Sequence, residues 1–440
     1  MGKRNIIIKG TNLIMKEKLA LLGGKAVRRK PFPPYNFIGK EELKAASYVI
    51  STGLLSKFIG CHDPDFLGGP KVQELETKWA AHMGAKFAIS INSCTSGLFA
   101  ACGAVGIGPG DEVIVSPYTM SASASCVLVY NAIPVFADVD EDTFCISPET
   151  IEKVISSRTK AIVVVHIMGH PADMDGIMQL AKEHNLKIIE DCAQSPGATY
   201  KNNKVGTIGN IGVFSLNYHK TIHTGEGGVA ITNNEELANR LRLIRNHAEA
   251  VCEDMGVTNL VNLLGFNYRM TEIEAAIGIE QLKKLDKLTE PRIKLANYLT
   301  KKLSKIEGII PPKVKSYEKH VYYIYPIKYD ENVIGIPREA FVKALNAEGI
   351  PLFEGYSKPL YLQPMYQKKI VYGDKGCPFT CHYYDKKISY DKGICPVAER
   401  LYEKELMYTN LCRPPLTFKD MDDVVTAIKK VISEKNSLAV

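Results

Sequence analysis

The segment Phe214–Gly228 holds a lysine in a setting that suits imine chemistry. It reads Phe214-Ser-Leu-Asn-Tyr-His-Lys-Thr-Ile-His-Thr-Gly-Glu-Gly-Gly228, so Lys220 lies five residues after Ser215 and just before a glycine-rich turn. A lysine amine whose pKa is lowered by burial can form an imine with an aldehyde cofactor. The Ser215 hydroxyl could reach a phosphate on that cofactor, and the glycines permit close backbone approach. Taken alone, a glycine-rich hairpin with a solvated lysine explains the segment equally well.

A second segment supplies a carboxylate at the end of a predicted strand. It reads Glu190-Asp-Cys-Ala-Gln-Ser-Pro-Gly197 and follows the apolar run that ends at Ile189. Asp191 could pair with a protonated pyridine nitrogen and keep the ring an electron sink. Gln194 could hydrogen-bond a ring hydroxyl. For an isolated aspartate, capping a helix is the commoner role.

A third segment, Asn92-Ser-Cys-Thr-Ser-Gly97, lies between a predicted strand and a predicted helix. The small side chains of Cys94, Thr95 and Ser96 leave backbone N–H groups accessible, and a helix N-terminus favours an anion. The segment could therefore hold a phosphate, although serine and threonine at a helix start usually only cap it.

Short β-rich runs alternate with helical spacing from about residue 86 to residue 232. The predicted strands are Phe87–Ile91, Glu112–Ser116, Ile133–Ala137, Ala161–Ile167, Lys187–Asp191, Gly212–Leu216 and Val229–Thr232, and the predicted helices are Thr95–Val105, Ser121–Tyr130, Pro148–Ser156 and Met174–His184. This alternation predicts an α/β fold with a mostly parallel sheet. Ligands bind such sheets at the carboxyl ends of the strands, so the three segments should converge.

The flanking regions are mainly helical, and the pattern changes near Arg292. We expect a large domain over residues 1–290, with an N-terminal helical segment, and a smaller domain over residues 291–440. Residues 356–395 are rich in Tyr, Lys, Pro and Gly and should be irregular. The further predicted elements are the helices Lys40–Thr52, Lys71–Met83, Glu235–Glu249, Thr271–Leu288, Arg338–Glu348 and Lys419–Ser433 and the strand Val321–Lys328.

Composition excludes several classes of protein. The net charge of +7 is small for 440 residues, and the basic residues are scattered, so we expect no nucleic-acid partner. The longest apolar run, around Ala161–Met168, is too short to span a bilayer. Lys9 and Lys16 interrupt the apolar residues at the N-terminus, which argues against a signal peptide. We expect a soluble cytoplasmic protein with no membrane partner.

The eleven cysteines do not resemble a disulfide framework, and free thiols are the simpler expectation. One cluster near the C-terminus raises the alternative of zinc. Its spacing is wider than the paired C-x₂-C pattern of structural zinc sites, so we expect free thiols and no metal. The cluster consists of Cys377, Cys381, His382, Cys395 and Cys412.

In their order along the chain, and together with the further segments given below, these three segments resemble the DegT/DnrJ/StrS family of pyridoxal-phosphate (PLP) aminotransferases. That family has fold type I in the aspartate-aminotransferase superfamily. The resemblance extends from about Leu19 to Leu416. It rests also on Leu19-Ala-Leu-Leu-Gly-Gly-Lys25, Gly108-Pro-Gly-Asp-Glu-Val-Ile-Val115, Asn246-His247, Leu264-Gly-Phe-Asn-Tyr-Arg-Met270 and His320-Val-Tyr-Tyr-Ile-Tyr325. It implies a seven-stranded, mostly parallel sheet in the large domain and a smaller α+β C-terminal domain.

The resemblance also implies a role for each residue. Lys220 would carry PLP as a Schiff base, Asp191 would pair with the pyridine nitrogen and Gln194 would lie near the ring hydroxyl. Ser215 and the turn Cys94-Thr95-Ser96 would bind the phosphate. Asn267 would reach that phosphate from a second subunit, so the working unit would be a homodimer with shared sites. Met120 stands where the family commonly has an aromatic residue on the ring, and a thioether could pack there instead.

The implied activity is transfer of an amine from glutamate or glutamine to a keto-sugar, nucleotide-linked in much of the family, or to a keto-cyclitol. Leu54, His247 and Tyr356 are the implied acceptor-pocket residues. The alternatives are a sugar dehydratase, an aminohydroxybenzoate-synthase-like enzyme or a non-catalytic relative. Dehydratases on this fold carry histidine in place of the lysine, whereas this chain has Lys220. Which ketone is aminated stays open.

Overall fold

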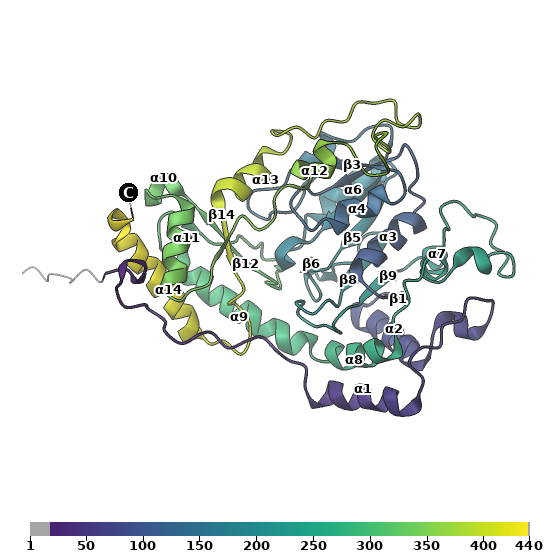
Figure 1. Cartoon of the computed structure of the whole chain (residues 1–440), viewed down its shortest axis with the longest axis horizontal. Coiled ribbons are helices and arrows are strands. Elements are labelled where there is room, and N and C mark those ends of the chain that lie inside the picture. Colours follow the sequence, from purple (N-terminus) through teal and green to yellow (C-terminus); the bar gives the residue numbers. More distant parts are fainter. Residues whose placement is uncertain (1–17, 439–440) are drawn as a thin grey trace, which may run out of the picture.

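A seven-stranded sheet forms the centre of the larger part of the molecule in the computed structural model, which describes residues 18–438 (Figure 1). Its strands are β1 (Phe87–Ile91), β2 (Glu112–Val115), β3 (Ile133–Phe136), β4 (Thr159–Val165), β5 (Lys187–Asp191), β8 (Ile211–Ser215) and β9 (Gly228–Thr232), in the order β1-β9-β8-β5-β4-β2-β3. The strands β3, β2, β4, β5 and β8 pair in parallel, and β9 is antiparallel to both of its neighbours. The predicted mostly parallel α/β sheet is confirmed.

Both faces of this sheet are buried, which explains why its strands read as nearly continuous apolar runs. In β9, Val229 and Ile231 pack in the same cluster as α2 (Pro70–Met83) and α8 (Glu272–Leu282), whereas Ala230 packs in the cluster that contains α3 (Cys94–Ala104). Side chains alternate along a strand, so one strand serves two cores. The remaining helices around this sheet are α1 (Lys40–Thr52), α4 (Ala122–Leu128), α5 (Pro148–Glu152), α6 (Met174–Glu183) and α7 (Glu235–Arg245).

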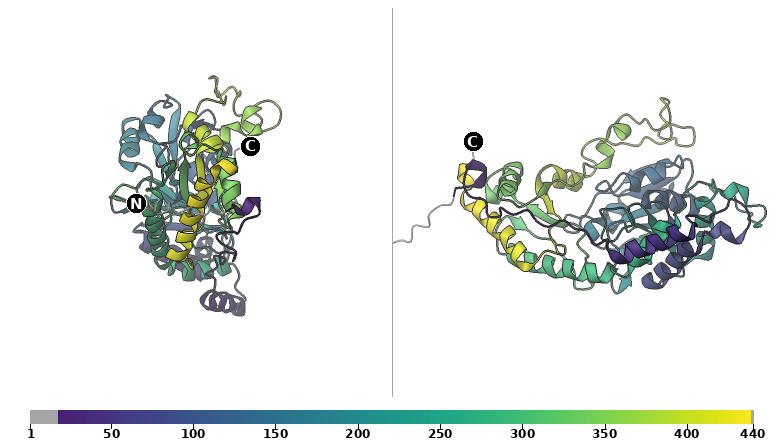
Figure 2. Two further views of the ribbon diagram at one scale, coloured as in Figure 1. Left: turned by 90° about the vertical axis from the view of Figure 1, so that its left-hand side faces the viewer. Right: turned by 60° about the horizontal axis from the view of Figure 1, so that its bottom comes forward.

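A small antiparallel sheet lies in the C-terminal part of the molecule (Figure 2). A second hydrophobic core surrounds it. That sheet has the order β10-β12-β14-β13, and Leu19 of the N-terminal segment packs in its core. The elements are β10 (Ile309–Ile310), β12 (Tyr325–Tyr329), β13 (Phe353–Glu354), β14 (Leu406–Thr409), α9 (Leu285–Leu303), α10 (Glu331–Ile334), α11 (Arg338–Ala347), α13 (Pro396–Arg400) and α14 (Phe418–Ser433). Helix α9 crosses residues 290 and 291, and the division into domains there stays a prediction.

Four predicted elements differ from the structure by four or more residues at one end, and one of them, the helix expected over Pro148–Ser156, ends at Glu152 as α5. The helix expected over Thr271–Leu288 is two helices, α8 and α9, because the chain turns after Leu282. Helix α7 stops at Arg245 and not at Glu249, because the backbone at His247 is left-handed (φ 51°). The strand expected from Val321 begins at Tyr325, since Tyr322 is also left-handed (φ 49°).

Residues 356–395 are irregular apart from short turns of helix such as α12 (Pro364–Gln367), as expected. Their aromatic side chains attach the segment to the large sheet at Phe136. The ring centroids of Tyr361, Tyr366 and Tyr390 lie 5.6, 5.5 and 5.6 Å from that of Phe136. The Tyr390 hydroxyl also donates to the carbonyl of Pro134 at 2.8 Å.

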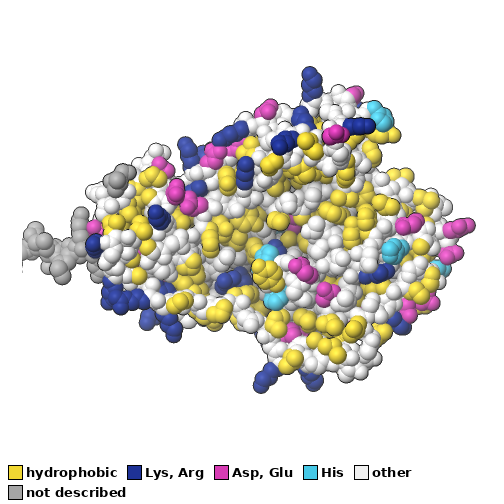
Figure 3. Space-filling model, in the orientation of Figure 1, with side chains coloured by type: hydrophobic (Ala, Val, Ile, Leu, Met, Phe, Trp, Pro, Cys, Tyr) yellow, Lys and Arg dark blue, Asp and Glu magenta, His cyan; other side chains and the backbone are white. Residues whose placement is uncertain are grey.

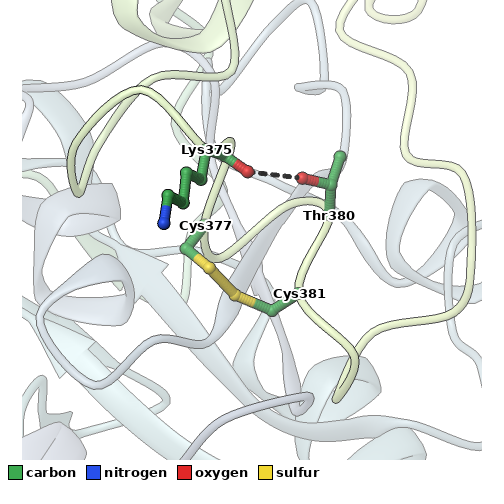
Figure 4. The surroundings of a disulfide bond; sticks show 4 residues. All are labelled: Lys375, Cys377, Thr380 and Cys381. Atoms are coloured by element: carbon green, nitrogen blue, oxygen red, sulfur yellow. Dashed lines mark hydrogen bonds between the residues drawn. A yellow bond between two sulfur atoms is a disulfide. The ribbon is translucent and has the colours of Figure 1, made fainter.

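The expectation of free thiols is wrong for Cys377 and Cys381, which form a disulfide (Figure 4). A tight turn brings their Cα atoms to 5.2 Å, within the usual range for a disulfide. In this turn the Thr380 N–H donates to the Gly376 carbonyl at 3.1 Å, and the Thr380 hydroxyl donates to the Lys375 carbonyl at 3.2 Å. The other nine cysteines are free.

Two further expectations concern metals and membranes. Within residues 18–438, the His, Cys, Asp and Glu side chains close enough to share a metal ion are His166, Glu190 and Cys192, and no member of the C-terminal cysteine cluster is among them. Glu190 already accepts hydrogen bonds from His166 and from three backbone amides. No helix in the same residues has the length and apolar character needed to cross a bilayer.

Candidate active site

A cavity of about 220 Å³ lies at the carboxyl ends of β1, β2, β5 and β8. It brings together eight of the residues predicted from the sequence. They are Cys94, Thr95, Met120, Asp191, Gln194, Ser215, Lys220 and Tyr356. Because β1 and β8 both pair antiparallel to β9, their ends meet at the same edge of the sheet as the end of β5.

Lys220 is buried, with 9% of its surface exposed. Its Nζ lies 4.8 Å from the centroid of the Tyr323 ring, and within residues 18–438 no carboxylate forms an ion pair with it. Burial lowers the pKa of Lys220, and Cys94 and Asp191 partly oppose this effect. A lysine in this setting holds its amine neutral, and therefore nucleophilic, at a lower pH than an exposed lysine does.

Asp191 ends β5 and is 5% exposed. The Ser123 hydroxyl donates to its Oδ2 at 2.8 Å, and the Ala193 N–H donates to its Oδ1 at 3.1 Å. Both bonds fix the orientation of the carboxylate at the cavity.

Gln194 and Tyr356 form a second fixed pair. The Gln194 Nε2 donates to the Tyr356 hydroxyl at 2.5 Å, and its Oε1 accepts from the Met168 N–H at 2.6 Å. Tyr356 has a left-handed backbone (φ 58°), which is uncommon for a bulky residue. Burial raises the pKa of Tyr356 to about 12, so its hydroxyl keeps its proton at neutral pH.

The start of α3 lies at the cavity. Ser93 caps the helix by accepting from the Ser96 N–H at 3.0 Å, and the first N–H groups of the helix lack partners within it. At the start of β9, Gly228 lies against this turn so closely that a Cβ there would be 2.7 Å from the Cys94 nitrogen. Glycine is required at residue 228 because any side chain would displace the turn.

Four predicted site residues do not line the cavity. Ser96 instead donates its hydroxyl to Asn92 Oδ1 at 2.7 Å. Asn267, Leu54 and His247 also lie outside the lining, and Asn267 is exposed. Met120 does line the cavity, although it is 67% exposed.

Ser123, Tyr323 and His219 are cavity or support residues whose roles the sequence did not predict. Tyr323 lies in the segment His320–Tyr325, which resembles the family, and His219 directly precedes Lys220. Their positions in the sequence could therefore have indicated both residues. Burial and the nearby Lys220 lower the pKa of His219. Nothing in the sequence singles out Ser123 among its neighbours Ser121 and Ser125.

Comparison with known proteins gives consistent matches along the chain. Residues 62–391 match the model of the DegT/DnrJ/EryC1/StrS aminotransferase family. The chain is 38% identical to GDP-perosamine synthase of Caulobacter vibrioides over 312 residues, covering 70% of this chain and 82% of that protein. It is 35% identical to L-glutamine:2-deoxy-scyllo-inosose aminotransferase of Streptomyces fradiae over 358 residues, covering 78% and 82%.

A solved aminotransferase from Psychrobacter cryohalolentis superimposes with a TM-score of 0.79 at 33% identity, covering 92% of this chain and 99% of that one. The fold of type I PLP-dependent transferases, expected from the resemblance, is confirmed. The match to the family model covers most of the chain and includes every residue of the cavity. This chain is therefore an aminotransferase of the DegT/DnrJ/EryC1/StrS family.

Proposed function

We propose that this aminotransferase uses PLP to move an amine from glutamate or glutamine to the ketone of a keto-sugar or keto-cyclitol, in amino-sugar or secondary-metabolite biosynthesis. The observation that carries the proposal is the cavity itself. It places the buried Lys220 amine, the fixed Asp191 carboxylate and the start of α3 together at one edge of the sheet. We also propose that the protein is cytoplasmic, as the sequence analysis expects.

The residues of the cavity fit PLP by their chemistry. The N–H groups at the start of α3 and the Ser215 hydroxyl suit the phosphate, and the Asp191 carboxylate suits a protonated ring nitrogen. The buried Asn217 Oδ1, also at the cavity, lacks a hydrogen-bond partner among the described residues. We assign the phosphate to Cys94, Thr95 and Ser215 of one subunit and to Asn267 of its partner.

The chemistry divides between cofactor and protein. When bound, PLP supplies an electron sink for the electrons of a broken substrate C–H bond. Lys220 then serves as the base that removes the proton from the donor carbon and as the acid that returns one to the acceptor carbon. Asp191 keeps the ring nitrogen protonated, and Gln194 holds Tyr356 at the cavity. Because burial lowers the pKa of Lys220, its amine becomes free to accept a proton at a lower pH than an exposed lysine does.

Two relatives support the two acceptor classes. One is named as a GDP-perosamine synthase and the other as a glutamine:2-deoxy-scyllo-inosose aminotransferase, so amination of carbohydrate and cyclitol ketones is found among proteins similar to this chain. Leu54, His247 and Tyr356 remain our proposed acceptor contacts, and Tyr356 is the one that lines the cavity.

The shared site requires a second subunit. Exposed apolar side chains on α1, namely Leu43, Tyr48 and Ile50, offer a surface for a partner, and Figure 3 shows apolar side chains over this lower edge of the molecule. Leu264, three residues before Asn267, is also exposed. We therefore propose a homodimer in which Asn267 completes the site of the other subunit.

Borohydride reduction of the purified protein tests the proposal. Reduction should link the cofactor irreversibly to the peptide that contains Lys220, with a matching mass increase, and Lys220→Ala should show no such label. A label on another lysine, or none, would overturn the assignment. Keto-sugar nucleotides and keto-inositols, each offered with glutamate and with glutamine, then identify the acceptor and donor by the aminated product.

A further inference from the structure

The Lys220 amine faces an aromatic ring. Its Nζ lies 4.8 Å from the centroid of the Tyr323 ring, within the distance of a cation–π contact. Tyr323 is partly buried, lines the cavity and packs against the core of the large sheet. Burial raises the pKa of its hydroxyl, so the hydroxyl keeps its proton at neutral pH. Tyr323 therefore presents the face of a neutral ring to the amine, and not a tyrosinate anion.

The other groups around the amine offer little to a positive charge. Cys94 and Asp191 act on Lys220 through space, and Lys220 in turn acts on His219. Burial raises the pKa of the Cys94 thiol, which therefore stays protonated, and burial lowers the pKa of His219. The Asp191 carboxyl group accepts hydrogen bonds from two other groups. An ammonium at Lys220 is thus left with the Tyr323 ring as a close favourable contact.

A left-handed turn after β4 fixes the position of Tyr323. The Val321 N–H donates to the Gly169 carbonyl at 3.0 Å, and the Ile324 N–H donates to the Met168 carbonyl at 3.4 Å. Met168 and Gly169 both have positive φ, at 58° and 91°. A Cβ at Gly169 would lie 3.0 Å from the Tyr323 nitrogen, so glycine permits this close approach. The backbone on both sides of Tyr323 is thereby attached to the turn.

The same turn connects Tyr323 to a predicted cofactor contact. The Met168 N–H donates to Gln194 Oε1 at 2.6 Å, and Gln194 Nε2 donates to the Tyr356 hydroxyl. Gln194 lies three residues after Asp191, in the segment that follows β5. Hydrogen bonds therefore hold Tyr323 and the segment after β5 together, and the ring has a fixed place beside the amine.

We propose that Tyr323 is a positioning residue whose ring face holds the Lys220 ammonium during proton transfer. This proposal rests on the proposed function, in which Lys220 takes a proton from the donor carbon and gives one to the acceptor carbon. On taking the proton the neutral amine becomes an ammonium, and on giving it the ammonium becomes an amine again. The electron-rich face of an aromatic ring attracts a cation and cannot take its proton. The ring therefore stabilises the charged form without competing for the proton.

Competitive labelling of the apoenzyme measures the Lys220 amine directly. The protein reacts with acetic anhydride at a series of pH values, and mass spectrometry of the peptide that contains Lys220 reports how much of its amine is unprotonated. Burial lowers the pKa of Lys220, and a cation–π contact opposes that effect. Tyr323→Leu removes the ring and keeps an apolar side chain, so the pKa of Lys220 should fall by about one further unit. Tyr323→Phe keeps the ring and should restore the wild-type pKa.

Tyr317→Leu is the matched control. The Tyr317 ring also has lysine amines nearby, with Lys201 Nζ at 5.2 Å and Lys315 Nζ at 5.8 Å from its centroid, but it lies outside the cavity. This variant should leave the pKa of Lys220 unchanged. An equal fall of that pKa in Tyr317→Leu and Tyr323→Leu would assign the effect to general loosening of this part of the chain and overturn the proposal.

A second replacement keeps the test valid if Tyr323→Leu does not fold. Pentafluorophenylalanine at residue 323 has nearly the shape of phenylalanine, but its fluorine atoms remove the electron-rich face of the ring. The pKa of Lys220 should then lie about one unit below its value in Tyr323→Phe. Equal values in these two proteins would overturn the proposal, as would an unchanged or raised pKa in a folded Tyr323→Leu protein.

The pH dependence of kcat connects the contact to catalysis. In the PLP-loaded enzyme, the acidic limb of kcat should move to lower pH by about one unit in Tyr323→Leu, because the free amine then persists at lower pH. Tyr323→Phe should restore the wild-type position of this limb. A limb that stays in place in Tyr323→Leu while the pKa of the apoenzyme moves would refute the role in proton transfer.

Failure of the proposed function has a different signature. A protein whose Lys220 pKa depends on the ring, but which aminates no ketone with any donor, would contradict aminotransfer and leave the contact between Tyr323 and Lys220 standing. A protein that aminates a ketone with the same pH profile in Tyr323→Leu and wild type would uphold aminotransfer and refute the role of Tyr323.

Discussion

At the scale of single residues, the site depends on groups that hold other groups. Asp191 could point in several directions at the end of β5, and the Ser123 hydroxyl selects one of them. Ser123 is fully buried in α4 and also lies 3.3 Å from the Thr119 hydroxyl. It is a positioning residue, because it acts through Asp191.

Ser123→Ala should weaken PLP binding and lower kcat while the fold persists. The variant removes one hydrogen bond to a carboxylate, and such bonds contribute about 1.5–3 kcal/mol, so the Kd for PLP should rise by roughly tenfold or more. Ser125→Ala, on the same helix, is the control, because its hydroxyl makes only a 3.4 Å bond to the Ala122 carbonyl. Titration of the apoenzyme with PLP measures the effect, and equal affinities for the two variants would refute the role of Ser123.

The buried Lys220 should make the stability of the apoenzyme depend on pH. Its pKa is lower in the folded state than in the unfolded state, so between the two values the unfolded chain binds more protons and stability rises with pH. Lys220→Met removes this linkage. The variant should be more stable than wild type at pH 7, and the difference should shrink as the pH approaches the usual lysine value of about 10.4.

Urea unfolding of both apoproteins at several pH values measures this difference. Lys182→Met serves as the comparison, because Lys182 is exposed on α6. A stability difference for Lys220→Met that stays constant over the range would contradict the burial argument.

At the scale of elements, some helix N-termini lie at the cavity, whereas others lie away from it and contribute only to the stability of the fold. Ser93 caps α3 at the cavity, and Ser147 caps α5 elsewhere by accepting from the Thr150 N–H. Both caps have the same local chemistry. Their difference in function arises from the strand that precedes each helix, because β1 ends at the cavity.

Ser93→Ala and Ser147→Ala should each lower the free energy of unfolding by about 1 kcal/mol, the usual contribution of a serine cap. Only Ser93→Ala should weaken the binding of PLP, because the first turn of α3 then loses its fixed geometry. Thermal unfolding and PLP titration measured on the same preparations separate the two effects. If both variants bound PLP like wild type, the start of α3 would not hold the phosphate.

At the scale of the whole molecule, the central prediction concerns shared sites in a homodimer. Lys220→Ala should be inactive, and Asn267→Ala should be impaired. In a mixed dimer of the two variants, one site would combine the intact Lys220 of one subunit with the intact Asn267 of the other. Equal mixing with random pairing should therefore restore up to roughly a quarter of the wild-type sites.

The measurement is activity after co-refolding or co-expression of the two variants. Asn259→Ala replaces Asn267→Ala in the control mixture, because its side chain lies outside the cavity and caps only its own turn. That mixture tests whether Lys220→Ala is rescued by any partner with an intact lysine. Activity in the Lys220→Ala and Asn267→Ala mixture no higher than the sum of the separate variants would argue against sharing.

The local pattern of apolar and polar residues predicted much of the fold, because it shows which side chains of each segment are buried. All seven strands of the large sheet were predicted within two residues at each end, and Lys40–Thr52 matches α1. The errors fall where local pattern carries no signal. The break between α8 and α9 interrupts a continuous helical pattern. A left-handed backbone follows the end of α7 at His247 and precedes the start of β12 at Tyr322, although side chains of this size usually avoid that conformation.

The sequence by itself determined the family, the sheet and the three strand-end segments that carry Lys220, Asp191 and the start of α3, because these depend on short motifs and on periodicity. Only the tertiary structure decided that Ser123 holds Asp191 and that Tyr356 reaches Gln194 across 162 positions of the chain. It alone placed Arg292 and Arg413 against the Tyr35 ring, three residues that are far apart in the sequence. Contacts of this kind arise from packing between distant elements, and no local pattern in a single sequence records them.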